Sequence, residues 1–466
     1  MNQVWRGLRS AAVSLWPPRL PGRRLLIVLA AAALVVVGLG VGAFLYLSDR
    51  VGDVSNPNVP FVDEGEQSPK QKPGAGFVWP TYGYTKDRRR HLDASIRPPF
   101  RRLWTFSNRA LLEFPPVIAH RRLFLLSDTA VVYAIGRDNG QVAWKRKVGS
   151  LAAASPTVDA ERVYVTVLQR TRRIKAGRVV ALAARRGHVL WSRPLRSRTE
   201  SSPLVHRGTL YFGTENGTVY ALRARDGRIR WTYKAAGAVK GGPALRKGVL
   251  YFGDYGGRVH AVRASNGRKV WSTGTKGARF GLTAGRFYSS PAVAFGRVYL
   301  GNTDGRMYSF AAQSGKLAWA KKTGDYIYGS PAVADIPHFG PAVYIGSYDG
   351  AFYALDARSG KVRWRRNMGG KISGAATVVG DVVYFANLQR RSTSGLAVRS
   401  GRRVFGFAHG GFNPVVSDGR RIYLVGYTSL YGLEPKKKAG RGGKRAKKKT
   451  EAKRKKKAKR RRKRGR

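Results

Sequence analysis

Cysteine is absent from all 466 residues, and methionine occurs only three times. The absence of cysteine excludes a disulfide framework, a thiolate nucleophile, a cysteine-ligated zinc or iron–sulfur site, and a lipid-modified cysteine near the N-terminus. Acidic residues are scarce as well, with 25 Asp and Glu against 88 Lys and Arg, so the formal net charge is +63. A charge of this size predicts an anionic partner but says nothing about the fold.

Patterns for metal and phosphate chemistry are missing too. The seven histidines show no HExxH or paired spacing, so we expect no metal-dependent hydrolysis. A phosphate-binding loop needs a helix after it, whereas the glycine-rich stretch at 253–257 (GDYGG) joins two expected strands. The sequence therefore predicts no catalytic residue and no metal site.

Only one long hydrophobic run is present. Residues 25–47 are 23 residues without a charge, enough for a helix that crosses roughly 30 Å of hydrocarbon. Five arginines and no acid precede it in residues 1–24, which we expect to stay in the cytoplasm. A cleaved signal peptide is the alternative, but its apolar region is about 7–15 residues long and a small-residue cleavage site follows it. We predict an uncleaved, single-pass anchor in a bacterial cell membrane, with the rest of the chain extracytoplasmic.

Two further segments lack a pattern that predicts a core. Residues 48–78 mix proline, glycine and polar residues, which is typical of a flexible linker. Residues 436–466 hold 21 basic residues and one acid, and we expect this tail to be disordered. Biased genome composition explains part of the charge of the body but not this tail. Because the tail is expected outside the cell membrane, anionic lipids or cell-wall polymers are its expected partners, and nucleic acid is not.

The middle of the chain repeats. Seven tryptophans recur at intervals of 40 to 48 residues, and a phenylalanine takes the eighth place: Trp104, Trp144, Trp191, Trp231, Trp271, Trp319, Trp364 and Phe405. Each period holds four short apolar stretches separated by turn residues, seen most clearly over residues 201–231. Four antiparallel strands in each period indicate one β-propeller blade per period.

The two ends of the repeat complete each other. The last period stops at Pro435 after three strands, whereas residues 101–106 have the character of a fourth strand with no first three before them. We therefore predict that the N-terminal strand completes the last blade and closes the ring, which removes free sheet edges. The expected fold is all-β, an eight-bladed propeller over residues 79–435 with four-stranded antiparallel blades, preceded by one transmembrane helix.

The repeat resembles the tryptophan-docking motif of the pyrroloquinoline-quinone propeller superfamily. The resemblance is carried by residues 224–231 (ARDGRIRW), 264–271 (ASNGRKVW) and 357–364 (ARSGKVRW), and by the entry segment 79–83 (WPTYG). It implies that the alanine and tryptophan of each blade interlock neighbouring blades. The pairs that match are Ala184 with Trp191, Ala224 with Trp231, Ala264 with Trp271, Ala312 with Trp319 and Ala357 with Trp364.

The superfamily contains quinone-dependent dehydrogenases and propellers without enzymatic activity. The dehydrogenases are similar in fold but carry adjacent cysteines against the quinone, a metal-binding carboxylate and amide set and long insertions. This chain has no cysteine and little room for insertions. In size it is more similar to outer-membrane-assembly and sensor propellers. We therefore expect a scaffold or sensor that binds envelope proteins without catalysis or cofactor. A quinone-dependent oxidoreductase with an atypical site is the alternative.

A ligand site in such a ring is expected where the loops that enter the innermost strands converge. The polar and aromatic candidates in those loops are Glu113, Glu200, Lys240, Tyr288, Tyr328, Lys371 and Asn413. Lysine and tyrosine there suit a small anionic or planar ligand. The competing interpretation is that glycine, serine and proline occur in these loops only because the inner strands crowd the axis.

Four acidic residues recur at one position of their blades: Glu215, Asp254, Asp304 and Asp349. Such a recurrence suits a ring of carboxylates around the axis. Each also lies beside glycine in a tight turn, where a carboxylate bonds the local backbone, and we prefer this second interpretation.

Overall fold

The computed structural model describes residues 22–49, 52–63, 71–74, 76–170, 175–275, 285–412 and 415–436. The chain divides into two units, residues 1–52 and 53–466. The first contains a single helix among its described residues, α1 (Arg23–Asp49), over the predicted hydrophobic run. Within the part of the chain that the structure describes, no helix meets the length and apolarity needed to cross a membrane. The predicted cytoplasmic segment up to residue 21, residues 64–70 and the tail from residue 437 lie outside the described residues.

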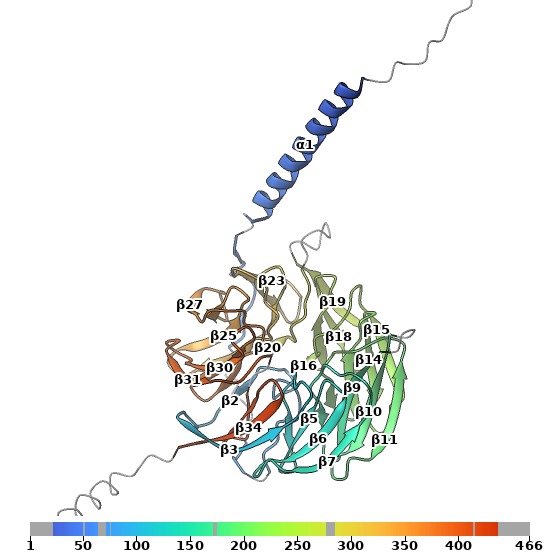
Figure 1. Ribbon diagram of the computed structural model, residues 1–466, viewed down its shortest axis with the longest axis vertical. Helices are drawn as coiled ribbons and strands as arrows, with labels where there is room; N and C mark the ends of the chain where they lie inside the picture. The colour runs from blue at the N-terminus through green and yellow to red at the C-terminus, as the bar shows by residue number, and fades with distance from the viewer. Residues whose placement is uncertain are drawn as a thin grey trace, which may run out of the picture. The chain divides into compact units, whose positions relative to one another are not determined.

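The second unit is the predicted eight-bladed propeller (Figure 1). Each of the first seven blades contains an antiparallel set of four strands that are consecutive in the chain, and the last blade combines three C-terminal strands with one N-terminal strand. In each blade the first strand named below is the innermost and the fourth is the outermost. Blades one to four are β4 (Val117–Ala119), β5 (Arg122–Leu126), β6 (Val131–Gly136), β7 (Val142–Lys147); β8 (Thr157–Val158), β9 (Arg162–Arg170), β10 (Lys175–Ala183), β11 (Val189–Leu195); β12 (Leu204–His206), β13 (Thr209–Gly213), β14 (Thr218–Arg223), β15 (Ile229–Lys234); and β16 (Ala244–Arg246), β17 (Val249–Gly253), β18 (Arg258–Arg263), β19 (Lys269–Gly274).

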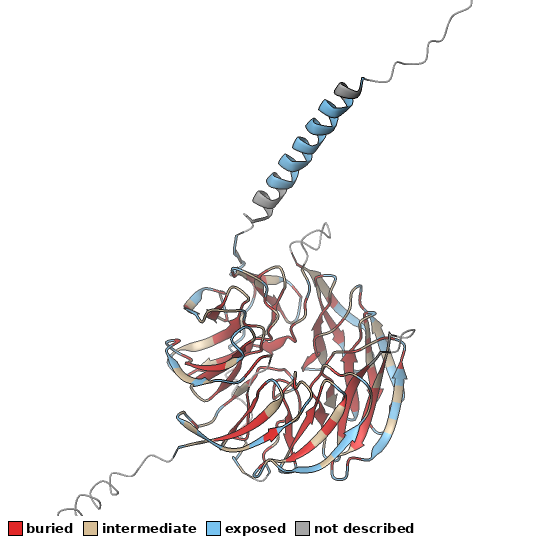
Figure 2. Ribbon diagram, in the orientation of Figure 1, coloured by how far each residue is buried: buried red, intermediate tan, exposed pale blue. Residues whose placement is uncertain are grey.

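The remaining blades follow the same order. They are β20 (Ala292–Ala294), β21 (Arg297–Gly301), β22 (Arg306–Ala311), β23 (Leu317–Lys322); β24 (Ala332–Ile336), β25 (Gly340–Gly346), β26 (Ala351–Asp356), β27 (Val362–Asn367); β28 (Thr377–Val379), β29 (Val382–Asn387), β30 (Ser392–Ala397), β31 (Arg403–Phe407); and β32 (Val416–Ser417), β33 (Ile422–Val425), β34 (Ser429–Pro435), β3 (Phe100–Ser107). Buried residues concentrate on the inner strands and exposed ones on the outer strands (Figure 2).

The ring closes as the two ends of the repeat predict. Strand β3 pairs antiparallel with β34, from Phe100 opposite Pro435 to Ser107 opposite Ser429. The eighth blade therefore joins the beginning of the propeller to its end. This pairing covers an edge of β34 that would otherwise be open to other chains.

Each repeated tryptophan docks its own blade onto the next one. The seven indole Nε1–H groups donate to backbone carbonyls of the following blade at 2.8–3.2 Å, and the acceptors in chain order are Arg137, Ala184, Ala224, Ala264, Ala312, Ala357 and Val398. The turn glycine of the acceptor blade packs on the ring, and a Cβ on Gly227 would lie 2.7 Å from the indole of Trp191. Burial of one indole is worth on the order of 4–6 kcal/mol before conformational entropy is counted.

The alanine and tryptophan of each blade therefore interlock neighbouring blades, as the resemblance implies. Trp191 bonds the carbonyl of Ala224 in the next blade, and Ala184 of its own blade accepts from Trp144 of the blade before. Phe405 has no N–H to donate and docks through its ring instead. It makes an edge contact with Phe100 of the eighth blade, with ring centroids 5.5 Å apart.

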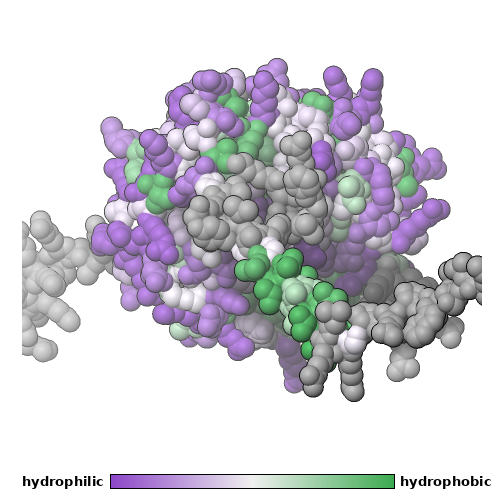
Figure 3. Space-filling view, turned by 90° about the horizontal axis from the view of Figure 1, so that it is seen from above, coloured by the Kyte–Doolittle hydropathy of each residue, from purple (hydrophilic) through white to green (hydrophobic). Residues whose placement is uncertain are grey.

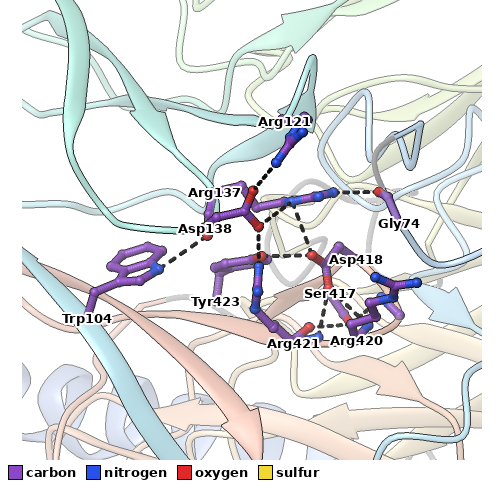
Figure 4. Close-up of polar contacts among 11 residues, drawn as sticks. Gly74, Trp104, Arg121, Arg137, Asp138, Ser417, Asp418, Arg420, Arg421 and Tyr423 are labelled. Carbon is purple, nitrogen blue, oxygen red and sulfur yellow. Dashed lines mark hydrogen bonds and ion pairs between the residues drawn. The ribbon is translucent and has the colours of Figure 1, made fainter.

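Ion pairs reinforce the seam between the eighth and first blades (Figure 4). Asp418, which is 1% exposed, accepts a hydrogen bond from the Tyr423 hydroxyl at 2.8 Å and lies 3.3 Å from Nε of Arg137 in the first blade. Asp138 of the first blade pairs in turn with Arg421 of the eighth and with Arg121. The ring is thus closed by β3 and by a charge network that crosses the same seam.

Part of the predicted flexible linker is ordered on the propeller. Strand β1 (Val54–Ser55) adds a fifth strand to the outer edge of the fifth blade, with Val54 opposite Ala320. Phe61 stacks on Phe295 with ring centroids 5.3 Å apart. We call residues 53–62 the strap. The prediction of a flexible linker is wrong for this segment, because apolar side chains spaced among its polar residues are enough to bury it.

Residues 79–92, which we call the axial segment, run past the innermost strands of seven blades. Its carbonyls accept backbone N–H bonds of 2.8–2.9 Å from Ile118, Val158, Leu245, Val293, Val333 and Val378. Its Thr81 hydroxyl bonds Pro203, and strand β2 (His91–Leu92) at its end pairs parallel with β28. The axial segment therefore ties the blades together along the axis and forms part of the site described next.

Candidate functional site

A cavity of about 320 Å³ lies where the loops of the ring converge. Five of the seven predicted site residues line it: Glu113, Glu200, Lys240, Tyr288 and Tyr328. They come from five different blades, the first and the third to the sixth, and each precedes the innermost strand of its blade. The expectation that these loops meet at one place is therefore correct for these five.

Lysine and glutamate in the cavity are bonded to one another. Lys240 Nζ lies 2.7 Å from Oε1 of Glu200 and 3.2 Å from Oε1 of Glu215. The Tyr288 hydroxyl donates to the other oxygen of Glu200 at 3.2 Å. Burial and the nearby charge of Glu200 raise the pKa of Tyr288 well above its ordinary value, so it stays a donor. The ammonium of Lys240 is consequently neutralised within the protein.

Glu113 is the second carboxyl group that lines the cavity. Burial, followed by the negative charges of Glu200 and Asp128, raises the pKa of Glu113 from 4.5 to about 7, although Lys240 opposes the shift. A carboxyl group with this pKa exchanges its proton near neutral pH. Glu113 can therefore offer either a hydrogen-bond donor or a negative charge to whatever enters the cavity.

This shift predicts a pH-dependent stability. The folded state keeps the Glu113 proton that the unfolded state releases, so this group lowers the free energy of unfolding as pH rises from about 4.5 to about 7. We expect Glu113→Gln to remove this dependence. The free energy of unfolding of the variant should equal that of the wild type near pH 4.5 and should be larger than that of the wild type above about pH 7. Urea unfolding of both proteins across this range measures the difference, and parallel curves would show that Glu113 is not buried as described.

Tyrosines form one wall of the cavity. Tyr255, Tyr288, Tyr328 and Tyr348 follow one another with ring centroids 6.3, 5.9 and 4.8 Å apart. The sequence argument missed Tyr255 and Tyr348, which also line the cavity. Both lie in the turn after the second strand of a blade, beside the recurrent acidic position. The signal that could have found them is the presence of an aromatic residue in this turn, because the turn faces the ring axis.

The last two predicted residues differ in their outcome. Lys371 does not line the cavity, but its Nζ lies 5.5 Å from the ring centroid of Tyr348, which does. It is a neighbour of the tyrosine wall, as Lys240 is over Tyr255 at 5.4 Å. Asn413 lies outside the described residues.

Two buried arginines of the axial segment lie behind the cavity. Tyr82 lines the cavity, and the guanidinium carbon of Arg90 lies 4.5 Å from the centroid of its ring. Arg88 is fully buried and donates to the carbonyls of Pro243 at 2.7 Å and Ser202 at 2.9 Å. Burial, and to a smaller extent Arg90, lowers the pKa of Arg88 to about 9. These arginines are bonded to the backbone and hold the axial segment in place.

The recurrent acidic residues make the contacts of turn residues. Asp254, Asp304 and Asp349 each accept a backbone N–H of their own hairpin at 2.8–3.0 Å. Glu215 is the exception and pairs with Lys240 and Arg198. Among the described residues, no three His, Asp or Glu side chains are grouped so that they could hold a metal ion.

Comparison with solved structures shows where this architecture recurs. BamB from Moraxella catarrhalis matches with a TM-score of 0.58 and 17% identity, over 72% of this chain and 100% of that one. A quinohemoprotein alcohol dehydrogenase from Pseudomonas putida HK5 matches with a TM-score of 0.65 and 15% identity, over 78% of this chain and 82% of that one. A europium-containing methanol dehydrogenase matches with a TM-score of 0.63 and 13% identity, over 78% of this chain and 98% of that one. At these identities the likeness shows the fold alone.

The sequence itself matches one family model. A search of curated proteins found no match. The family model described as outer membrane protein assembly factor BamB, in contrast, matches three overlapping segments, residues 99–238, 166–334 and 216–440. Together they cover the propeller from β3 to the end of the eighth blade. The chain therefore belongs to the BamB family of pyrroloquinoline-quinone-like propellers.

Proposed function

We propose that this protein is a membrane-anchored, extracytoplasmic propeller that binds envelope proteins as a scaffold or sensor and has no catalytic activity of its own. The family description, an outer membrane protein assembly factor, supports a role in holding proteins together in the envelope. The match to Moraxella catarrhalis BamB extends over that entire chain. The propeller of this chain thus contains the counterpart of a complete assembly-factor propeller.

The observation that carries the proposal is the internal pairing of charges in the cavity. Pyrroloquinoline quinone carries three carboxylates, so a site that holds it must offer cations or N–H donors that are free to bond them. Lys240 is already bonded to Glu200 and Glu215, and Glu113 adds another carboxyl group to the lining. The cavity residues therefore do not fit this quinone. The size of the cavity and its tyrosine wall, together with the two structurally similar dehydrogenases, keep a quinone-dependent oxidoreductase as the second candidate.

The anchoring part of the proposal rests on the sequence. The uncharged run of residues 25–47 and the five arginines before it favour an N-terminus inside and a propeller outside. The basic residues after position 435 would then face anionic lipids or cell-wall polymers, which they attract by charge. Hydrophilic side chains dominate the propeller face seen in Figure 3 and suit such a location at the membrane surface.

Cross-linking in intact cells tests the scaffold function. The full chain and a variant that lacks residues 1–47 are treated with an amine-reactive cross-linker, and the attached proteins are identified. We expect the full chain to capture envelope proteins reproducibly and the variant to lose them, because only the anchored chain reaches that compartment. Capture of cytoplasmic proteins alone by the full chain would contradict both the proposed location and the scaffold function.

A further inference from the structure

The strap shows how the outer edge of a blade binds an extended segment. Strand β1 pairs antiparallel with β23, with Ser55 opposite Trp319, and the N–H of Asn56 donates to the carbonyl of Ala318 at 2.7 Å. The carboxylate of Asp53 accepts the backbone N–H of Lys322 at 2.9 Å and pairs with Nζ of Lys321 at 2.5 Å. An extended segment is therefore held on a basic outer strand by backbone bonds and by the charge of one carboxylate, that of Asp53.

Strand β7 of the first blade offers the same edge without a strap. Its sequence, VAWKRK, aligns with LAWAKK of β23, and the two share their register: Tyr133 lies opposite Lys145 as Tyr308 lies opposite Ala320. The backbone groups of Ala318 and Lys322 face outwards to the strap, so those of Ala143 and Lys147 face outwards from β7. In the sheet order β7 is the last strand.

Burial shows what the strap does and what β7 lacks. Trp319, under the strap, is 1% exposed, and Ala318 and Ala320 are almost as deeply buried. In β7 the residues around the half-buried Trp144 are all exposed, and Val142 is 43% exposed. The uncovered strand therefore leaves apolar surface and edge-facing backbone groups open to a partner.

Charge distinguishes β7 from the other outer strands. Lys145 and Lys147 stand at its outward positions, and neither bonds any described residue. Several basic residues of other outer strands are engaged: Lys234 with the carbonyl of Asn216, Arg365 with Tyr353, and Arg366 with Ser400 and Gly401. Arg102 of β3, Arg230 of β15 and Lys269 of β19 bond no described residue, but each is the single such residue of its strand, whereas β7 has two on one face. Strand β11 contains Pro194, which has no N–H to donate. Two free ammonium groups beside an open edge are complementary to an acidic strand.

We propose that the outer edge of β7 binds an extended acidic segment of a partner protein, which adds a fifth antiparallel strand to the first blade. The backbone groups of β7 supply the hydrogen bonds, and Lys145 and Lys147 attract carboxylates by charge. The position of Lys321 is taken in β7 by Arg146, which donates to the carbonyl of Gly187. A second copy of β7 is a poor occupant, because its own lysines would face these two. The inference rests on the proposed scaffold function and names one of its binding surfaces.

The test uses the full-length chain and a synthetic nonapeptide that alternates glutamate and valine. Binding is followed by fluorescence anisotropy of the labelled peptide and by hydrogen exchange of the Lys145 and Lys147 amides. We expect slower exchange of both amides on binding, and affinity at least about tenfold weaker for Lys145→Glu with Lys147→Glu. The same peptide methylated on alternate backbone nitrogens keeps its charge but loses its strand bonds, and it should bind at least about tenfold more weakly too.

The matched control separates this site from general attraction to a basic protein. Arg225→Glu with Arg228→Glu changes two exposed charges in the turn between β14 and β15 of the third blade, away from β7, and should leave peptide affinity unchanged. Equal losses in both double variants, or undiminished binding of the methylated peptide, would overturn the proposal. Such a failure would concern the edge of β7 alone, because the cross-linking experiment tests the scaffold function separately.

Discussion

Replacing Asp418 with alanine is expected to lower the free energy of unfolding of the propeller by about 3–5 kcal/mol. The substitution removes the carboxylate opposite Arg137, whose side chain is 6% exposed, and it takes the acceptor from the Tyr423 hydroxyl. Arg137 then keeps the carboxylate of Asp138, 3.7 Å away and partly exposed, and the carbonyl of Gly74. The loss of its buried ion pair and the unbonded hydroxyl both destabilise the seam where the last blade meets the first. Chemical unfolding of the full chain and the variant measures the difference.

Asp138 provides the control from the same network. It pairs with Arg421 across the seam and with Arg121 of its own blade, but its side chain is 39% exposed. Exposed pairs contribute little, so Asp138→Ala should cost below about 1 kcal/mol. If the two variants lost equal stability, the seam would not depend on the buried ion pair, and ring closure would rest on β3 alone.

The number and order of the blades follow from the sequence because their determinants are local. A tryptophan, a turn glycine and four apolar stretches recur in each period, so one blade predicts the next. The missing fourth strand of the last period then locates β3. The partner of each indole was not readable in the same way. Trp191 reaches Ala224 because the following blade presents its carbonyl there, and only the packing of two blades determines that contact.

The axial segment and the strap could not be predicted, because their contacts are not periodic. Residues 87–90 (DRRR) have the composition of a solvated surface, yet Arg88 and Arg90 are fully buried and bonded to carbonyls. The strap pairs through only two strand residues, which is too short for an alternating pattern. In both segments the bonding partners come from distant blades, so the local sequence does not indicate them.

The candidate site was predicted in part for a related reason. Loops that enter the innermost strands repeat in every blade, and five of the named residues from those loops line the cavity. Tyr255 and Tyr348 belong to a different turn, and they line the cavity only because that turn reaches the axis as well. The pairing of Lys240 with Glu200 also joins two blades, so the sequence showed the charges but not their mutual neutralisation.

Quinone retention tests the central claim, that this propeller is a scaffold and not a quinone enzyme, most directly. The full chain is incubated with pyrroloquinoline quinone and calcium and passed over a gel-filtration column, and the protein fraction is examined for quinone absorbance and for dye reduction with alcohols or sugars. Because Lys240 is bonded to Glu200 and Glu215, we predict that no quinone stays with the protein and that no dye is reduced. Stoichiometric retention of the quinone together with dye reduction would contradict the scaffold function and establish the oxidoreductase in its place.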